Sequence, residues 1–152
     1  MPSDLIQALR SGSLKAVRDA LDADAKGRIP AQAVTDAGRL AFQAALALFK
    51  KRGADLNGIY RGYRALHSLM QERAHRESEA PSQGRVSCLE WLLANGADPE
   101  LPAAWPPARG VIIAAFTGVS VYVEAMRSGG ARFDGFAAAA LGDKLRDPEE
   151  LA

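Results

Sequence analysis

The chain has 152 residues, which is enough for one domain of ordinary size. Apolar residues make up 48% of it and charged residues 24%, so the composition excludes an intrinsically disordered chain. The single cysteine, Cys88, excludes an internal disulfide and a thiolate cluster for zinc or iron, and two histidines leave little room for a histidine metal site. We therefore expect a protein without cofactors or bound metals.

The formal net charge is +1, which argues against nucleic acid or an anionic membrane as a partner. The charge is unevenly spread, because residues 1–76 carry +6 and residues 77–152 carry −5. We expect a monomer, with weak head-to-tail self-association as the alternative that this asymmetry allows. No apolar stretch approaches the roughly 20 residues that span a bilayer, and no secretory signal is visible, so we expect a cytoplasmic protein.

Alanine is the most informative residue type, with 30 copies in the chain. It is the best helix former and a poor strand former, so its abundance predicts closely packed helices. The 14 glycines and 8 prolines are then expected between helices rather than within them. The composition therefore predicts an all-α protein.

A repeated pattern divides the chain. Residues 84–96 and residues 118–130 each begin and end with glycine, and Gly53 closes a third, less regular copy. Apolar residues recur about every third position in each copy, which is the period of one helix face. We therefore predict that the closing glycines, Gly53, Gly96 and Gly130, are structural and take the left-handed conformation that ends a helix.

Apolar runs about one helix long, at residues 63–70 and 110–117, precede the two regular copies. A helix, a tight turn, a second helix and a closing glycine, at a period near 33 residues, resemble the ankyrin repeat. The Gly-x-Thr-Pro-Leu-His frame of that family is matched here at Gly62, Leu66 and His67. The resemblance implies an ankyrin-type solenoid of about four helix pairs plus a terminal half-repeat.

The resemblance covers residues 1–152 as a single domain. Its units are a capping pair (3–26), a degenerate repeat (27–57), a repeat (58–100) with an insertion at 73–83, a further repeat (101–134) and a half-repeat or cap (135–152). In the degenerate repeat we predict helices over residues 31–37 and 40–51, with Gly38 between them. Arg64 and Arg109 replace the threonine of the frame, which removes a local hydrogen-bond anchor. The insertion is either a solvated excursion or a contact specific to this protein.

Candidate reactive residues are few. By the resemblance, His67 is structural and bridges the backbone of adjacent turns. Cys88 falls in an apolar column of its helix, so we expect a buried hydrophobic side chain rather than a reactive thiol. No serine stands in a nucleophile turn, and no glycine-rich loop ends in Lys-Ser or Lys-Thr. We therefore expect that the protein is not an enzyme.

The predicted loops carry aromatic and arginine side chains, which are the residue types that most often anchor protein interfaces. The candidate partner-binding residues are Tyr60, Arg61, Tyr63, Arg64, Trp105, Arg109 and Phe133. For Tyr60 and Trp105 the alternative is that they fold back and cover the edge of the stack.

The resemblance implies a non-enzymatic module that binds a partner protein through the concave face and the loop tips. A sharper hypothesis is an inhibitor or immunity-type protein that plugs the active site of its partner. Two alternatives stay open: a structural segment of a longer ankyrin array, and a small helical enzyme or ligand-binding domain that mimics the repeat. The richness in alanine and arginine favours a bacterial source with a G+C-rich genome.

Overall fold

The computed structural model describes residues 2–24, 27–71, 82–104, 107–135 and 137–139. Within these ranges the chain forms helices and turns, with two isolated β-bridges and no longer strand. The prediction of an all-α fold is therefore confirmed for this part of the chain. The labelled helices are α1 (Pro2–Ser11), α2 (Leu14–Ala23), α3 (Ala31–Arg39), α4 (Gln43–Lys51), α5 (Ala65–Gln71), α6 (Gln83–Ala94), α7 (Gly110–Thr117) and α8 (Ser120–Ser128).

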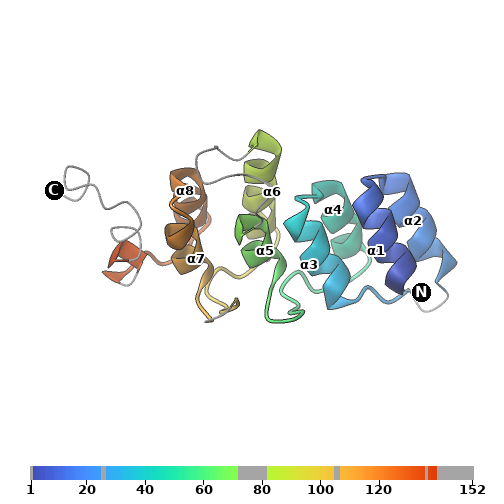
Figure 1. Cartoon of the computed structure of the whole chain (residues 1–152), viewed down its shortest axis with the longest axis horizontal. Helices are drawn as coiled ribbons and strands as arrows, with labels where there is room; N and C mark the ends of the chain where they lie inside the picture. The colour runs from blue at the N-terminus through green and yellow to red at the C-terminus, as the bar shows by residue number, and fades with distance from the viewer. Residues whose placement is uncertain (1, 25–26, 72–81, 105–106, 136, 140–152) are drawn as a thin grey trace.

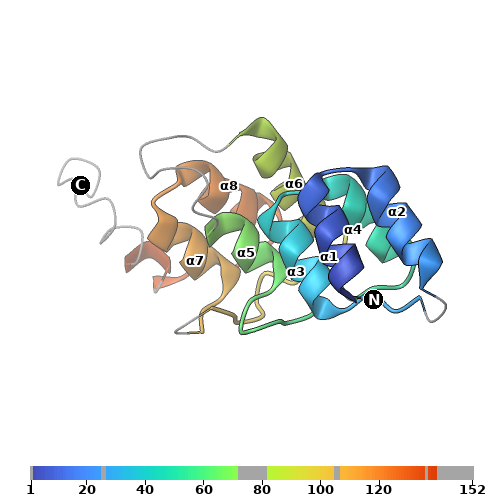
Figure 2. The ribbon, with the colours of Figure 1, turned by 45° about the vertical axis from the view of Figure 1, so that its right-hand side comes forward.

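The labelled helices form four successive pairs in a single row (Figure 1). The first members of the pairs (α1, α3, α5 and α7) lie side by side in one layer, and we call them the inner helices (Figure 2). The second members (α2, α4, α6 and α8) form the layer behind, and we call them the outer helices. Apolar side chains from both layers bury one another in a single cluster, so the core runs along the row between the layers.

Three outer helices end in the same way. Gly53, Gly96 and Gly130 have φ angles of 89°, 110° and 97°. In each case the alanine after the glycine donates its amide to the carbonyl five residues earlier, at 3.0, 2.9 and 2.9 Å. This is the Schellman ending, in which the left-handed residue lets the chain satisfy the last helical carbonyls. The left-handed conformation predicted for the closing glycines is confirmed.

The α3/α4 pair differs from its prediction. α3 runs through Gly38, and α4 begins at Gln43 rather than at residue 40. A tight turn separates the two helices, because Ala41 has a φ of 53° and the Phe42 amide donates to the carbonyl of Ala37 at 2.9 Å. Alanine gives no signal for positive φ, so this turn could not be placed from the sequence.

Small residues set the spacing of the inner helices. A Cβ on Gly38 would lie 2.6 Å from the Cα of Ala65, the first residue of α5. A Cβ on Gly110, the first residue of α7, would lie 3.2 Å from a methyl carbon of Leu66 in α5 and 2.6 Å from the terminal methyl carbon of Met126 in the outer helix α8. Gly38 was expected between helices, but it lies inside α3, where its lack of a side chain allows α5 to approach closely.

Arg85, near the start of α6, joins two inner helices. Its Nη1 donates to the carbonyl of Leu69 at 2.7 Å, and its Nη2 donates to the carbonyl of Arg39 at 2.9 Å. Both carbonyls lie at the C-terminal ends of their helices, where intrahelical donors are lacking and a cation is favoured. This role of Arg85 could not be predicted, because its two acceptors are distant from it in sequence.

Most of the predicted insertion and most of the predicted half-repeat fall outside the described residues. The insertion predicted at 73–83 is described only at its end, where Ser82 caps α6 by accepting the Arg85 amide at 3.2 Å and Gln83 is already helical. The half-repeat predicted at 135–152 is described only at residues 135 and 137–139. None of the helices in the described part of the chain is long and apolar enough to cross a membrane.

Candidate functional site

Two turns project from the row of helices on the same side, one before α5 and one before α7 (Figure 1). The first turn, residues 57–64, is a short hairpin in which Tyr60 and Tyr63 exchange two backbone hydrogen bonds of 2.9 and 3.0 Å. The central residues, Arg61 and Gly62, have φ angles of 51° and 85°. Positive φ at both positions defines the type I′ turn, whose twist suits a two-residue hairpin. The backbone of the first turn therefore has the regular geometry of a two-residue hairpin.

Ile59, Tyr60 and Arg61 form the hairpin tip. Ile59 is 50% exposed, Tyr60 is partly exposed and Arg61 is exposed. The Arg61 guanidinium lies 5.2 Å from the centroid of the Tyr60 ring, within cation–π range. The tip thus presents an aliphatic, an aromatic and a cationic side chain next to one another.

The base of the first turn is bound to the following loop. Arg64 donates from Nη1 to the carbonyl of Asn57 and from Nε to the carbonyl of Pro102, the second bond being 3.1 Å long. The side chain of Asn57 donates to the carbonyl of Gly96 at 2.9 Å and accepts the amide of Asp98 at 2.7 Å. These side chains fix the first turn against residues about 40 positions further along the chain.

The second turn, residues 100–109, contacts both the first turn and α5. The amide of Ala104 donates to the carbonyl of Gly62 at 2.7 Å, which joins the two turns through their backbones. His67 is fully buried, and its Nε2 donates to the carbonyl of Ala108 at 2.9 Å. Burial lowers the pKa of His67, the nearby Arg64 guanidinium lowers it further, and the Ala108 carbonyl partly opposes both. His67 is therefore neutral at pH 7 with its proton on Nε2.

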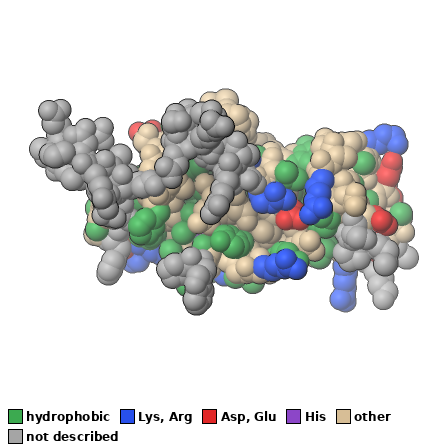
Figure 3. All heavy atoms as spheres, viewed as in Figure 1, with side chains coloured by type: hydrophobic (Ala, Val, Ile, Leu, Met, Phe, Trp, Pro, Cys, Tyr) green, Lys and Arg blue, Asp and Glu red, His purple; other side chains and the backbone are tan. Residues whose placement is uncertain are grey.

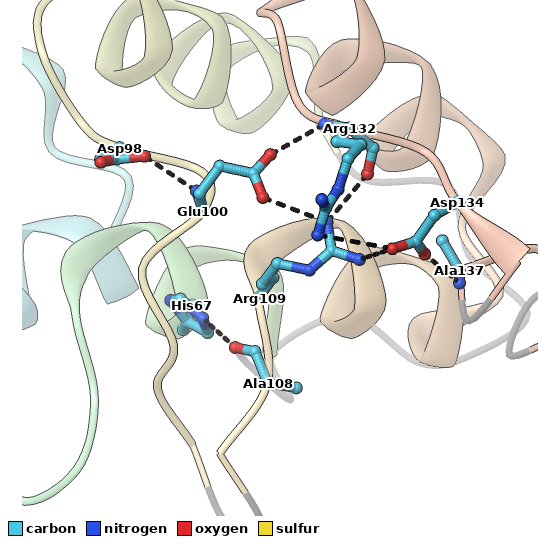
Figure 4. Close-up of polar contacts among 8 residues, drawn as sticks. All are labelled: His67, Asp98, Glu100, Ala108, Arg109, Arg132, Asp134 and Ala137. Atoms are coloured by element: carbon cyan, nitrogen blue, oxygen red, sulfur yellow. Dashed lines mark hydrogen bonds and ion pairs between the residues drawn. The ribbon is translucent and has the colours of Figure 1, made fainter.

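Arg109, the residue before α7, occupies the centre of a polar cluster (Figure 4). Its Nη1 donates to Glu100 at 3.2 Å and to the carbonyl of Arg132 at 2.9 Å, and its Nη2 lies 2.7 Å from Asp134. The Arg109 side chain is 17% exposed. The pKa of Glu100 is lowered, mainly by the amide of Arg132, and that of Asp134 is lowered mainly by the amide of Ala137, with Arg109 assisting in both cases.

Other predicted binding residues also have internal contacts. Tyr63 packs against the core, and its carbonyl accepts the Thr35 hydroxyl at 3.3 Å. Phe133 packs against the core as well, with the Arg127 guanidinium 4.6 Å from the centre of its ring. Trp105 lies outside the described residues.

The predicted residues thus do not form one surface. Tyr60 and Arg61 lie together at the hairpin tip, whereas Arg64 and Arg109 hold successive turns together. Replacing the threonine of the frame was expected to remove an anchor, but in the structure each arginine provides an anchor that reaches the next turn. Sequence reasoning did not single out Ile59, although its position beside Tyr60 in a predicted loop was a usable signal.

Besides Ile59 in the hairpin tip, a large apolar side chain on an inner helix is also exposed. Phe116, in α7, is 53% exposed. On the face shown in Figure 3, charged side chains gather over the half that holds α1–α4, and the described atoms over α5 and α7 are mainly uncharged. The exposure of Phe116 could not be predicted from the sequence, because residues 110–117 are apolar on all sides and such a helix is expected to be buried.

The reactive groups considered from the sequence are inaccessible. Cys88 is fully buried, and burial raises the pKa of its thiol to about 11. His67 faces Ala108, whereas Arg109 faces Glu100 and Asp134, so these two side chains do not converge on a common space (Figure 4). In the described part of the chain, no three His, Cys, Asp or Glu side chains are placed to hold a metal ion.

Comparison with known proteins gives no family assignment. No protein-family model matches the chain, and no curated protein is significantly similar to it in sequence. The fold and the site define a row of helix pairs in which two inner helices, α5 and α7, are preceded by projecting turns that are hydrogen-bonded to each other.

Proposed function

We propose that this chain is a divergent ankyrin-type repeat protein and a non-enzymatic module that binds a partner protein. Support for the repeat assignment comes from four helix pairs in a row and from the common ending of α4, α6 and α8. The bond from His67 to the turn before the next inner helix is also the kind of contact that the family resemblance implies.

The observation that carries the binding proposal is the contrast within the first turn. Ile59 and Arg61 are exposed and Tyr60 is partly exposed, while Asn57 and Arg64 hold the same turn against its neighbour. A loop that is already ordered loses little conformational entropy on binding, so more of the contact energy is retained as affinity. Tyrosine and arginine are also among the side chains that contribute most at interfaces.

The tip also indicates the chemistry of the partner. An aliphatic and an aromatic side chain suit an apolar depression, and the guanidinium of Arg61 suits a carboxylate at its rim. Because the turn projects from the row of helices, such a depression can be a concave site, which is the form that an inhibitor or immunity-type function would take (Figure 1). The uncharged α7 with its exposed Phe116 provides further apolar contact area.

The test compares capture of partners by a tip variant and by a matched control. The tip variant is Ile59→Ser/Arg61→Asn, in which asparagine suits the positive φ of a type I′ turn and keeps the fold. The control is Ala44→Lys/Ala47→Lys, which changes two exposed residues of α4. Proteins are captured by crosslinking from cells of the source organism and quantified by mass spectrometry.

We expect a set of proteins captured by the wild type and the control and depleted at least tenfold with the tip variant, since a loss of 1.4 kcal/mol corresponds to that factor. Equal capture by all three forms would mean that the tip is not the binding surface. Circular dichroism of each form verifies that the helices are retained.

A further inference from the structure

Outer helices α6 and α8 border a groove of about 830 Å³. Its lining includes five apolar side chains, namely Val86, Leu93 and Ala94 from α6 and Val121 and Ala125 from α8. Val121 is 38% exposed, so part of the apolar lining of the groove stays open to solvent in the described part of the chain. Because a Cβ on Gly129 would lie 2.6 Å from Leu93, the two helices are in close contact at the end of α8.

Two carboxylates occupy equivalent positions along this groove. Glu90 and Glu124 each follow the opening glycine of their repeat by six residues, and both line the groove and are exposed. Neither makes a hydrogen bond or an ion pair with another residue in the described part of the chain. The described residues that line the groove include no lysine, arginine or histidine. The groove therefore carries negative charge that no described cation balances.

Each helix presents its carboxylate between groove-lining residues about one turn away on either side. On α6, Val86 precedes Glu90 by four residues and Leu93 follows it by three. On α8, Val121 precedes Glu124 by three residues. The equivalent position is Arg18 on α2 and Ala47 on α4, so the paired carboxylates distinguish the α6/α8 groove from the rest of the outer layer.

We propose that the α6/α8 groove binds an amphipathic helix of a partner protein whose apolar stripe is interrupted at its centre by lysine or arginine. The apolar residues of that helix pack on Val86, Leu93 and Val121, and its central cations lie between Glu90 and Glu124. The twelve residues of α6 extend for about 18 Å, which accommodates a helix of about three turns. This site is separate from the hairpin tip and does not depend on the function proposed for it.

Charge complementarity selects this occupant. An acidic or uncharged helix would place apolar residues correctly but would leave both carboxylates partly desolvated without a counter-charge. A nucleic acid or an anionic lipid surface would be repelled by the same two groups. A cationic amphipathic helix both packs on the apolar lining of the groove and supplies counter-charges for the two carboxylates.

The experiment uses the full chain and a synthetic probe. The probe is a fluorescein-labelled amphipathic peptide of about four helical turns, with leucines one turn on either side of two central arginines. A second peptide has the arginines replaced by glutamates and is otherwise identical. Binding is measured by fluorescence anisotropy, and the site is located by chemical-shift changes of backbone amides.

We expect saturable binding of the arginine peptide with shifts confined to α6 and α8. The variant Glu90→Gln/Glu124→Gln removes two negative charges and should weaken that binding about tenfold, in line with two partly exposed ion pairs. The matched control Ala44→Lys/Ala47→Lys changes the net charge by the same amount on α4 and should bind as the wild type does. The tip variant Ile59→Ser/Arg61→Asn should also bind normally.

Three results would overturn the proposal. The first is an arginine peptide that fails to saturate, or that binds the Glu90→Gln/Glu124→Gln variant equally well. The second is equal binding of the glutamate peptide, which would show that apolar contacts alone account for binding and that the two carboxylates do not select the charge of the helix. The third is a set of groove amides that shift when the free protein is diluted, which would show that a second copy of the chain occupies the groove.

Discussion

Arg61 and Arg64 lie three residues apart in the same turn, and the structure gives them different surroundings. Arg61 is exposed at the hairpin tip, where its contact is with the neighbouring Tyr60 ring. Arg64 is partly buried and donates to the carbonyls of Asn57 and Pro102. Residue type therefore does not distinguish the exposed Arg61 from the structural Arg64; the carbonyls within reach of each guanidinium do.

The same contrast recurs around the second turn. Arg109 and Arg132 both approach Asp134, at 2.7 and 3.6 Å. The Arg109 side chain is 17% exposed and the Arg132 side chain 70%. Buried charged hydrogen bonds contribute more to stability than exposed ion pairs, because water and salt screen the exposed ones. The two arginines thus provide a matched pair for mutation.

The largest effect is expected at Arg109. Arg109→Ala removes the donors to Glu100, Asp134 and the Arg132 carbonyl and should lower the free energy of unfolding by about 2 to 3 kcal/mol. Arg132→Ala keeps the backbone bond from Arg132 to Glu100 and should change the free energy of unfolding by less than about 0.5 kcal/mol. Urea unfolding followed by circular dichroism measures both variants. Equal losses would show that the Arg109 cluster is no stronger than a surface ion pair.

A smaller effect is expected at Asn57. Asn57→Ala removes the two hydrogen bonds to Gly96 and Asp98 and should lower the free energy of unfolding by about 1 to 2 kcal/mol. Asn57→Asp retains the acceptor for the Asp98 amide but loses the donor to Gly96. Its free energy of unfolding should therefore lie between those of the alanine variant and the wild type. The same urea titration ranks the three proteins. A ranking in which Asn57→Ala equals the wild type would contradict the role given to this side chain.

A third effect depends on pH. The unfolded chain binds a proton on His67 near its ordinary pKa of 6.5, whereas burial holds the pKa of the folded protein lower. The folded state binds fewer protons in the window between these values, so the free energy of unfolding should fall as the pH is lowered from about 6.5 and level off below the folded pKa. His67→Gln should lack this decline.

Chemical unfolding at a series of pH values above 4.5 measures the decline and keeps it apart from the loss of the Glu100 and Asp134 contacts. The pKa values of those two carboxyls are held below their ordinary values of 4.5 and 3.8, so their contribution is lost only at lower pH. An identical decline in the wild type and in His67→Gln would assign the effect to other groups.

Features encoded by neighbouring residues could be predicted from the sequence. The closing glycines predicted the ends of α4, α6 and α8, because a left-handed residue after a helix is a local requirement. The apolar column that contains Cys88 predicted its burial, because helical period and burial are linked within one helix.

Features that depend on distant partners could not be predicted. The end of α3 was placed too early, because glycine is typical of helix ends, whereas Gly38 lies inside α3 at its close contact with Ala65 of α5. The roles of Arg64 and Arg85 were missed because their acceptors, such as Pro102 and Arg39, lie 38 and 46 residues away. No pattern among neighbouring residues indicates a hydrogen bond between residues so far apart in sequence.

The most direct test measures Arg61→Asn and Arg64→Asn side by side, for both the free energy of unfolding and the capture of partners. We expect that Arg61→Asn leaves the free energy of unfolding within about 0.5 kcal/mol of the wild type and reduces capture, and that Arg64→Asn lowers the free energy of unfolding by about 1 to 3 kcal/mol. Retained capture by Arg61→Asn, or equal stability losses in the two variants, would contradict the division between a binding tip and a structural base.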